Sequence, residues 1–335
     1  MRAMHRHLPI ACSLLLAFCI GRAWAAAVPA TAAVASADGA VVRLQLDAVA
    51  FAPERIKLAV YLPPGYDGAA AAGRRYPVLY ANDGQDMPAV GLQPTLARLY
   101  REHAIEPVIV VAIGMLADRA SGYGLSDRAT ARSVTGGSPI GPIGARAQDY
   151  SAWVATTLVP YVDAHYRTRR SVRDRTMLGW SLGALNAFNL GWEYPDVFGR
   201  IGAFSPSFWL AADRSSATAI EHTRLVQGMV DRGPRRDGLK MWFAVGTAEE
   251  TSDRDGNGII DAVNDVQDVI EGYRGAGGFH ARGLEQLGYS VNLDYAHHAS
   301  RTADVSLFLL QGGHHNQTAW GQVLPPFLVW AYGKH

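Results

Sequence analysis

The spacing of apolar residues along the first third of the chain predicts strands and a helix. Residues 41–46 and 55–62 alternate apolar and polar positions, which predicts an antiparallel pair of strands. Residues 76–80 and 107–113 are continuous apolar runs, typical of strands that are buried on both faces. Between these runs, residues 94–102 have the spacing of a helix.

The second half of the chain continues this alternation. Residues 148–165 carry an apolar stripe at helical spacing, formed by Tyr150, Trp153, Val154, Leu158, Tyr161 and Val162. A strand ending at Leu178 precedes a helical stretch over residues 182–192, and further strands are expected at 201–204, 241–245 and 305–310. We therefore predict an α/β fold, with a mostly parallel central sheet and helices on both faces.

The N-terminus has the pattern of a signal peptide. Arg2 and Arg6 precede an apolar stretch at residues 8–20, and Ala23-Trp24-Ala25 supplies small residues for cleavage. Residues 1–25 are therefore predicted to be removed on export to the periplasm or the medium. The stretch is too short and wrongly flanked for a transmembrane helix, so stable membrane insertion is not expected.

Composition after this segment limits the possible chemistry. Cys12 and Cys19 both lie in the predicted signal peptide, so the mature chain has neither disulfides nor thiol chemistry. Residues 26–40 are rich in Ala, Val, Pro and Ser and are expected to form a flexible tail. No linker divides the remainder of the chain, so we predict one domain over residues 41–335.

Charge argues against polyanionic partners. The formal net charge is +1, and the charged residues are interspersed, with no basic run. Neither nucleic acid nor an anionic membrane surface is therefore an expected partner.

A short motif identifies a candidate nucleophile. Gly179-Trp180-Ser181-Leu182-Gly183 reads G-x-S-x-G and lies between a predicted strand and a predicted helix. That setting is the one required for a nucleophile elbow, a sharp turn that holds a serine hydroxyl exposed at its tip. The backbone N–H of Leu182, the residue after the serine, is then expected to form one half of an oxyanion hole.

A serine nucleophile needs a base and usually an acid that orients the base. Glu249 and Glu250 follow the strand at 241–245, and His314 and His315 follow the strand at 305–310. The order serine, carboxylate, histidine is that of a triad on an α/β-hydrolase sheet. We therefore predict Ser181 as the nucleophile, with one of the two glutamates as the acid and one of the two histidines as the base.

Several blocks of sequence resemble one known family over residues 40–333. They are Tyr80-Ala81-Asn82-Asp83-Gly84-Gln85, Asp163-Ala164-His165-Tyr166-Arg167-Thr168, the elbow motif, Tyr194-Pro195-Asp196-Val197-Phe198, Ser205-Pro206-Ser207-Phe208-Trp209 and His315-Asn316-Gln317-Thr318-Ala319-Trp320. Together they resemble the esterase family of α/β-hydrolases that groups D-type, siderophore (enterochelin-type), feruloyl and acetyl-xylan esterases with mycolyltransferases.

The resemblance refines the candidate site. The family pattern G-G-H-N-E-x-x-W implies His315 as the base, although Gln317 replaces the usual glutamate. A G-T-x-D pattern of feruloyl-esterase members implies Glu249 as the acid, with Glu250 as the alternative. The second oxyanion N–H is implied for Gln85. Asp83, Trp180 and Tyr123 are further expected to contact the substrate, a small ester, and no cofactor is expected for catalysis.

Three functions remain open at this stage. The first is an exported serine hydrolase of carboxylic esters. The second is an acyltransferase that forms the same acyl-enzyme and passes the acyl group to an alcohol or sugar, as mycolyltransferases do. The third is a non-catalytic binding protein that retains the elbow.

An acidic stretch predicts a metal site between the candidate acid and the candidate base. Residues 253–261 match the first nine places of an EF-hand-type calcium loop within a predicted insertion at about 251–275. The expected ligands are Asp253, Asp255, Asn257, the carbonyl oxygen of Ile259, and Asp261. Asn264 stands at place 12, where a bidentate carboxylate is usual, so we expect a weak, structural Ca²⁺ site.

Overall fold

The computed structural model describes residues 31–36, 39–139 and 141–334. Ten of the strands form one sheet in the order β1-β2-β3-β5-β4-β8-β9-β10-β14-β13. These strands are β1 (Thr31–Ser36), β2 (Gly39–Asp47), β3 (Arg55–Leu62), β4 (Val78–Ala81), β5 (Ile109–Ile113), β8 (Arg175–Trp180), β9 (Arg200–Phe204), β10 (Lys240–Gly246), β13 (Val291–Asn292) and β14 (Val305–Leu310).

The sheet is parallel from β5 to β13 and antiparallel at its other edge. β4 pairs in parallel with β5 and β8, and the parallel pairing continues through β9, β10 and β14 to β13. β1, β2 and β3 pair antiparallel, and β3 joins β5 antiparallel. Two small two-stranded sheets are formed by β6 (Leu125–Asp127) with β7 (Arg132–Val134) and by β11 (Tyr273–Arg274) with β12 (His280–Ala281).

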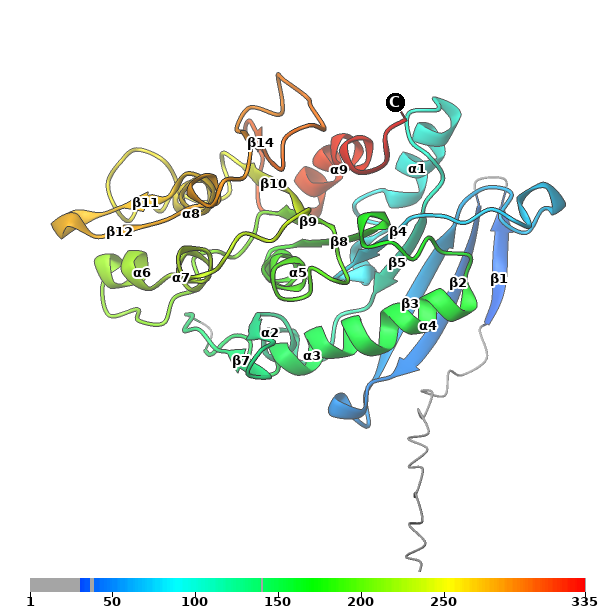
Figure 1. The fold of residues 1–335 in the computed structure, drawn as a ribbon, viewed down its shortest axis with the longest axis horizontal. Coiled ribbons are helices and arrows are strands. Elements are labelled where there is room, and N and C mark those ends of the chain that lie inside the picture. Colours follow the sequence, from blue (N-terminus) through cyan, green and yellow to red (C-terminus); the bar gives the residue numbers. More distant parts are fainter. Residues whose placement is uncertain (1–30, 37–38, 140, 335) are drawn as a thin grey trace, which may run out of the picture.

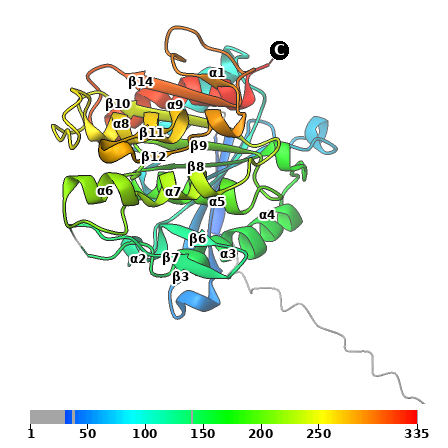
Figure 2. The same ribbon diagram turned by 60° about the vertical axis from the view of Figure 1, so that its left-hand side comes forward.

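Helices cover both faces of the large sheet (Figures 1 and 2). One face packs against α1 (Leu92–Arg101) and α9 (Gln317–Tyr332). The other packs against α3 (Ala147–Trp153), α4 (Val159–His165), α5 (Leu182–Glu193), α7 (Leu225–Arg232) and α8 (Asp261–Glu271). The remaining helices are α2 (Arg119–Gly122) and α6 (Ala217–Thr223). The predicted α/β class, with a mostly parallel sheet and two helical layers, is confirmed.

The helix expected over residues 148–165 differs in its middle turn. Residues Val154–Leu158 form a π-helical segment between α3 and α4. Pro160, near the start of α4, has no N–H to donate to the carbonyl four residues earlier. A wider turn accommodates this missing hydrogen bond, and the apolar stripe still faces the core.

Two predicted boundaries need correction. Residues 26–40 were expected to form a flexible tail, but Thr31–Ser36 form β1, which pairs with β2 because β2 otherwise leaves an open edge. The predicted insertion at 251–275 contains α8, whose apolar residues belong to the core of the sheet.

The predicted signal peptide, residues 1–25, lies outside the described residues, so export remains a prediction. Among the described residues, none of the helices has the length and apolar character needed to cross a membrane.

Candidate active site

Ser181 lies on a strained turn between β8 and α5. Its backbone has φ 56° and ψ −126°, a conformation that is rare for a residue with a side chain. The turn is held on both sides: the Ser181 N–H donates to Phe204 O at 3.0 Å, and the Ser181 carbonyl accepts from Ala184 and Leu185 at the start of α5. The predicted strand–turn–helix geometry is present, and Ser181 is half-buried.

Both glycines of the motif are required by close contacts. A Cβ at Gly179 would lie 2.1 Å from the carbonyl oxygen of Gly183. A Cβ at Gly183 would lie 2.5 Å from a carboxylate oxygen of Asp83. Only residues without side chains allow the elbow to fold this tightly against the neighbouring loop.

The loop that follows β4 packs directly against the elbow. Asn82 donates through its amide nitrogen to Gly183 O at 2.9 Å, and its amide oxygen accepts from Tyr150 at 2.8 Å. Asp83 is buried and adopts φ 54°, and both of its carboxylate oxygens accept from Arg119 at 2.8 Å. Burial raises the pKa of Asp83, and the hydrogen bonds from Arg119 oppose that shift. This ion pair fixes the loop in place.

His315 and Glu249 form a hydrogen-bonded pair at the same edge of the sheet. His315 follows β14 and Glu249 follows β10, and the two side chains meet with Nδ1 2.8 Å from Oε2. Glu249 is 3% exposed and His315 is 40% exposed, so a buried carboxylate supports a solvent-accessible imidazole. His314 points elsewhere, with its Nδ1 2.7 Å from Ala248 O. The carboxylate of the alternative acid, Glu250, instead accepts a hydrogen bond from the backbone N–H of Ala262, at the start of α8.

Two residues that the sequence analysis did not single out hold this pair in place. Ser205, directly after β9, donates to Glu249 Oε1 at 2.5 Å, and the Gly246 N–H donates to the same oxygen at 2.7 Å. Trp320 in turn donates to Ser205 Oγ at 2.9 Å. Both residues lie in the sequence blocks that resemble the esterase family, which was the one available sign of their role.

Trp320 also connects the His315 side of the site to the elbow. Its ring stacks on Trp180, the residue before Ser181, with centroids 5.5 Å apart. Its other neighbour is the imidazole of His315, which meets it edge-on at 5.3 Å. The ring of Trp320 therefore contacts both His315 and Trp180, the residue that precedes Ser181.

The two predicted oxyanion residues lie at the start of α5 and in the turn after β4. Leu182 is the first residue of α5, and a helix provides no carbonyl acceptor within itself for the N–H groups of its first turn. Gln85 lies in the 3₁₀ turn Gly84–Asp86 after β4, and its side-chain oxygen accepts from Met115 N at 3.1 Å. A Cβ at Gly84 would lie 2.7 Å from the carbonyl carbon of Ala112, so a glycine is needed to bring this turn onto β5.

The three residues expected to contact substrate serve a different purpose. Asp83, Tyr123 and Trp180 are each at most 1% exposed, so their side chains offer no surface to a substrate. Tyr123 accepts a hydrogen bond from the Asp83 N–H, and Trp180 donates to Asp86. This corrects the prediction: the three buried side chains stabilise the loop after β4 and the elbow and do not contact the substrate.

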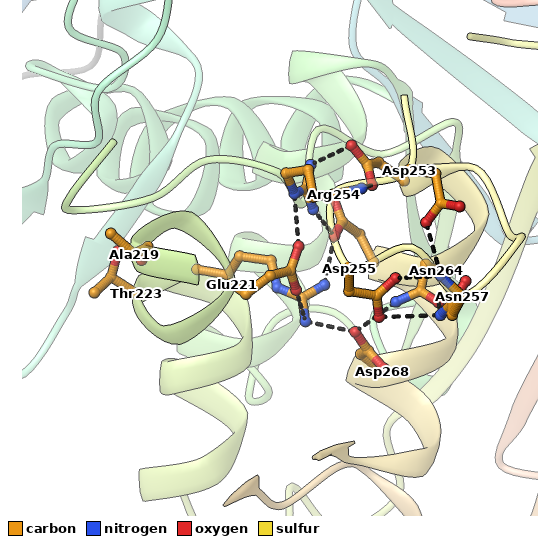
Figure 3. A network of polar contacts seen from close by, with 12 residues as sticks. Ala219, Glu221, Thr223, Asp253, Arg254, Asp255, Asn257, Asn264 and Asp268 are labelled. Atoms are coloured by element: carbon orange, nitrogen blue, oxygen red, sulfur yellow. Dashed lines mark hydrogen bonds and ion pairs between the residues drawn. The ribbon is translucent and has the colours of Figure 1, made fainter. Parts of the chain in front are cut away.

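The predicted calcium ligands are only partly brought together. Asp253 accepts from the N–H groups of Asn257 and Gly258, and Asn257 donates to Asp255 and to Asn264, the residue at place 12 (Figure 3). Asp261, expected at place 9, instead binds Arg254 through both of its oxygens. Across the described residues, no three His, Cys, Asp or Glu side chains are arranged to hold a metal ion. The ligand set does not fit as predicted, and calcium binding remains a prediction.

A buried ion cluster anchors this loop to the helices beneath it. Arg224, between α6 and α7, is 1% exposed and pairs with Glu221, Asp265 and Asp268. Arg254 pairs with Glu221, Asp261 and Asp265 (Figure 3). Four carboxylates thus share two guanidinium groups, and burial raises the pKa of Asp265 to about 7.

Comparison with solved structures supports the fold. A ferulic acid esterase superposes with a TM-score of 0.58 at 15% identity, covering 89% of this chain and 99% of that one. The enterobactin esterase of Shigella flexneri superposes with a TM-score of 0.58 at 16% identity, covering 86% of this chain and 58% of that one.

Comparison with curated proteins gives relatives that match about half of this chain. The uncharacterized protein YbbA of Bacillus subtilis is 24% identical over 159 residues, which is 46% of this chain and 57% of that protein. An endo-1,4-beta-xylanase/feruloyl esterase of Xylanibacter ruminicola is 27% identical over 172 residues, which is 49% of this chain and 21% of that protein. The chain thus spans little more than half the length of its Bacillus relatives, YbbA and YjcH, at 57% and 56%.

A family model covers far more of the chain. The model described as "Putative esterase" matches residues 50–329, from the connection between β2 and β3 into α9, and so includes the elbow, Glu249 and His315. Together with the fold, this match confirms the expected resemblance: the chain belongs to the esterase family of α/β-hydrolases.

Proposed function

We propose that this protein is a serine esterase that cleaves carboxylic esters through an acyl-enzyme on Ser181, with His315 as general base and Glu249 as the acid that orients it. The observation that carries the proposal is the 2.8 Å contact between His315 Nδ1 and Glu249 Oε2 at the sheet edge where the strained Ser181 lies. A carboxylate that accepts a hydrogen bond from Nδ1–H holds the imidazole in the tautomer whose Nε2 is unprotonated and basic.

The first half of the reaction forms the acyl-enzyme. The Ser181 oxygen attacks the ester carbonyl carbon, and its proton passes to Nε2 of His315. The carbonyl π electrons move to oxygen, and this oxyanion accepts hydrogen bonds from the N–H groups of Leu182 and Gln85. When the intermediate collapses, the bond to the alcohol oxygen breaks, and the leaving alcohol takes the proton from His315.

The second half repeats these steps with water. Water gives a proton to His315 and attacks the acyl carbon. When this second tetrahedral intermediate collapses, His315 returns the proton to the Ser181 oxygen and the carboxylic acid product is released. Glu249 stabilises the imidazolium in both halves and remains ionised throughout. Ser205 and the Gly246 N–H both bind Oε1 of Glu249, so Oε2 remains directed at His315.

A chromogenic assay tests the proposal. The wild type is expected to hydrolyse p-nitrophenyl acetate and butyrate, and Ser181→Ala is expected to lower kcat by roughly 10³-fold or more. Ser215→Ala, at an exposed serine, is the control and is expected to keep full activity. Absence of turnover in the wild type, or full activity of a folded Ser181→Ala, would contradict the proposal.

The same assay separates hydrolysis from acyl transfer. An added alcohol acceptor competes with water for the acyl-enzyme, so product analysis gives the partition between acid and new ester. We expect the free acid to predominate, because the family match and the superposed structures name esterases. Predominant transfer would assign the acyltransferase function instead.

A further inference from the structure

A groove of about 540 Å³ opens beside the candidate active site. It is lined by residues of β2 and β3, by the end of β5, and by the turn that contains Gly84 and Gln85. This volume lies within the range of about 300–1,000 Å³ that is usual for small-molecule sites.

The topology places this groove at the edge of the sheet where catalysis is proposed. Because β3 runs antiparallel to β5, its first residues meet the C-terminal end of β5, as Leu58 pairs with Ile113. Gln85, the proposed oxyanion residue, forms part of the groove wall. The groove therefore begins at the proposed oxyanion site and extends away from Ser181, across one face of β5 and β3, toward β2.

Small residues create the space. Ala59, Ala112 and Gly114 form part of the groove wall, where larger side chains would fill it. Gly114 lies so close to β3 that a Cβ there would approach Lys57 O to 3.0 Å. Tyr61, on the same face of β3 as Ala59, adds an apolar side chain to the floor.

Two cationic side chains line the same groove. Arg43 on β2 and Lys57 on β3 both line the groove and are exposed. The register pairs Arg43 with Ala59 and Gln45 with Lys57, so the two cations are diagonal neighbours on one face of the sheet. Diagonal positions lie about 7–8 Å apart, which lets two long side chains reach one ligand group.

The carboxylates nearby are directed elsewhere. Arg55, a third cation on the same face of the sheet, lies opposite Asp47 and pairs with it at 2.6 Å. Asp83 is bound by Arg119, and Asp86 accepts from Trp180 and Gln317. No carboxylate is among the described residues that line the groove.

We propose that this groove binds the acyl arm of the ester and that Arg43 and Lys57 recognise a carboxylate at its far end. The substrate class is then a half-ester of a dicarboxylic acid, or an ester whose acyl chain ends in an equivalent anion. This inference rests on the proposed esterase function, since the groove is oriented by the oxyanion loop. From β8 to β3 the arm must cross three strand spacings, about 14 Å in all, which suits a chain of roughly ten atoms.

A pair of matched substrates tests the inference. The mono-p-nitrophenyl ester of decanedioic acid ends in a carboxylate, and the same ester with a terminal carboxamide has nearly the same shape without the charge. Wild-type kcat/KM is expected to favour the acid by about tenfold, as two charge-assisted contacts in a partly exposed groove would give. This preference is expected to fall as salt is added.

Variants then assign the preference to the two cations. Arg43→Gln with Lys57→Met is expected to bring the ratio of kcat/KM for the acid to kcat/KM for the amide close to one, and Lys57→Arg is expected to keep that ratio. The matched controls are Arg101→Gln and Lys334→Met, both exposed and away from the groove. A wild-type ratio near one, or a ratio that the double variant keeps, would overturn the inference.

A binding measurement separates this inference from the catalytic proposal. The monoanilide of decanedioic acid ends in the same carboxylate, and its amide bond is far more resistant to hydrolysis than an ester. We expect calorimetric titration to show tighter binding of this anilide than of its carboxamide analogue, and the double variant to remove the difference. Tighter binding without turnover of any ester would refute the esterase and keep the groove. Ester turnover without the charge preference would do the reverse.

Discussion

The conformation of one residue, Ser181, links the fold to the proposed chemistry. A residue with a side chain held at φ 56° costs on the order of 1–3 kcal/mol, and such strain persists only where surrounding structure enforces it. Here the enforcing contacts come from β9, from the first turn of α5 and from the loop after β4. The strain holds the hydroxyl at the tip of the turn, where an ester can reach it.

The doubled histidine gives the first prediction. His315→Ala is expected to lower kcat about as much as Ser181→Ala, by roughly 10³-fold or more, because members of a triad act as a unit. His314→Ala is the matched control and is expected to cost far less, because its ring faces the carbonyl of Ala248. Steady-state kinetics on p-nitrophenyl butyrate measures both. If His314→Ala is the inactive variant, the assignment of the base is wrong.

At the scale of elements, helices α6, α7 and α8 are joined by buried charge. Arg224 lies at the junction of α6 and α7, and two of its three carboxylate partners, Asp265 and Asp268, come from α8. A buried ion pair gives little net stability compared with apolar packing, but removal of one partner leaves an uncompensated buried charge. The cluster therefore specifies the relative position of these helices more than it adds to the free energy of their packing.

Removal of the central guanidinium is the second prediction. Arg224→Met is expected to lower the free energy of unfolding by about 3–5 kcal/mol, because three carboxylates lose their shared partner inside the protein. Arg98→Met is the control, since the Arg98–Glu102 pair on α1 is exposed and worth at most about 1 kcal/mol. Urea denaturation measures both variants. Equal effects would show that the buried cluster does not stabilise the docking of α8.

The loop before α8 gives the third prediction, which concerns Ca²⁺. Asp253, Asp255 and Asn257 already lie together, so we expect weak binding that stabilises the native state by about 2.7 kcal/mol when free Ca²⁺ is 100 times Kd. The melting temperature should then rise with Ca²⁺ and fall with chelator, and Asp253→Asn should weaken the response. A melting curve that neither millimolar Ca²⁺ nor chelator moves would show that this stretch is an acidic loop without an ion.

For the whole molecule, the sequence predicted the sheet more completely than the site. Apolar periodicity and run length located the main strands because the parallel strands are buried on both faces. The G-x-S-x-G motif located Ser181, and the contact between Glu249 and His315 matches the pair that the family resemblance favoured. Ser205, Trp320 and the Asp83–Arg119 pair act through contacts between residues distant in sequence, which no local pattern encodes. Tyr123 and Trp180 were misassigned because buried and cleft-lining aromatic residues look alike in a sequence.

The predicted signal peptide gives the fourth prediction. Expression of the full chain in a bacterium with general secretion is expected to deliver the protein to the periplasm with residues 1–25 removed. N-terminal mass spectrometry of the exported protein should then find Ala26 as the first residue, because Ala23 and Ala25 provide the small residues of the cleavage site. Replacement of both alanines with leucine is expected to block cleavage. A cytoplasmic product that begins at residue 1 or 2 would refute export.

The central claim is that Ser181 is the nucleophile and that His315 activates it. The most direct measurement is peptide mapping by mass spectrometry after reaction with a fluorophosphonate, which forms a stable adduct only with an activated serine. We expect a single adduct on the peptide that contains Ser181, no adduct in Ser181→Ala, and labelling slowed by orders of magnitude in His315→Ala. An adduct on another serine, or a Ser181 that labels equally fast without His315, would contradict this account.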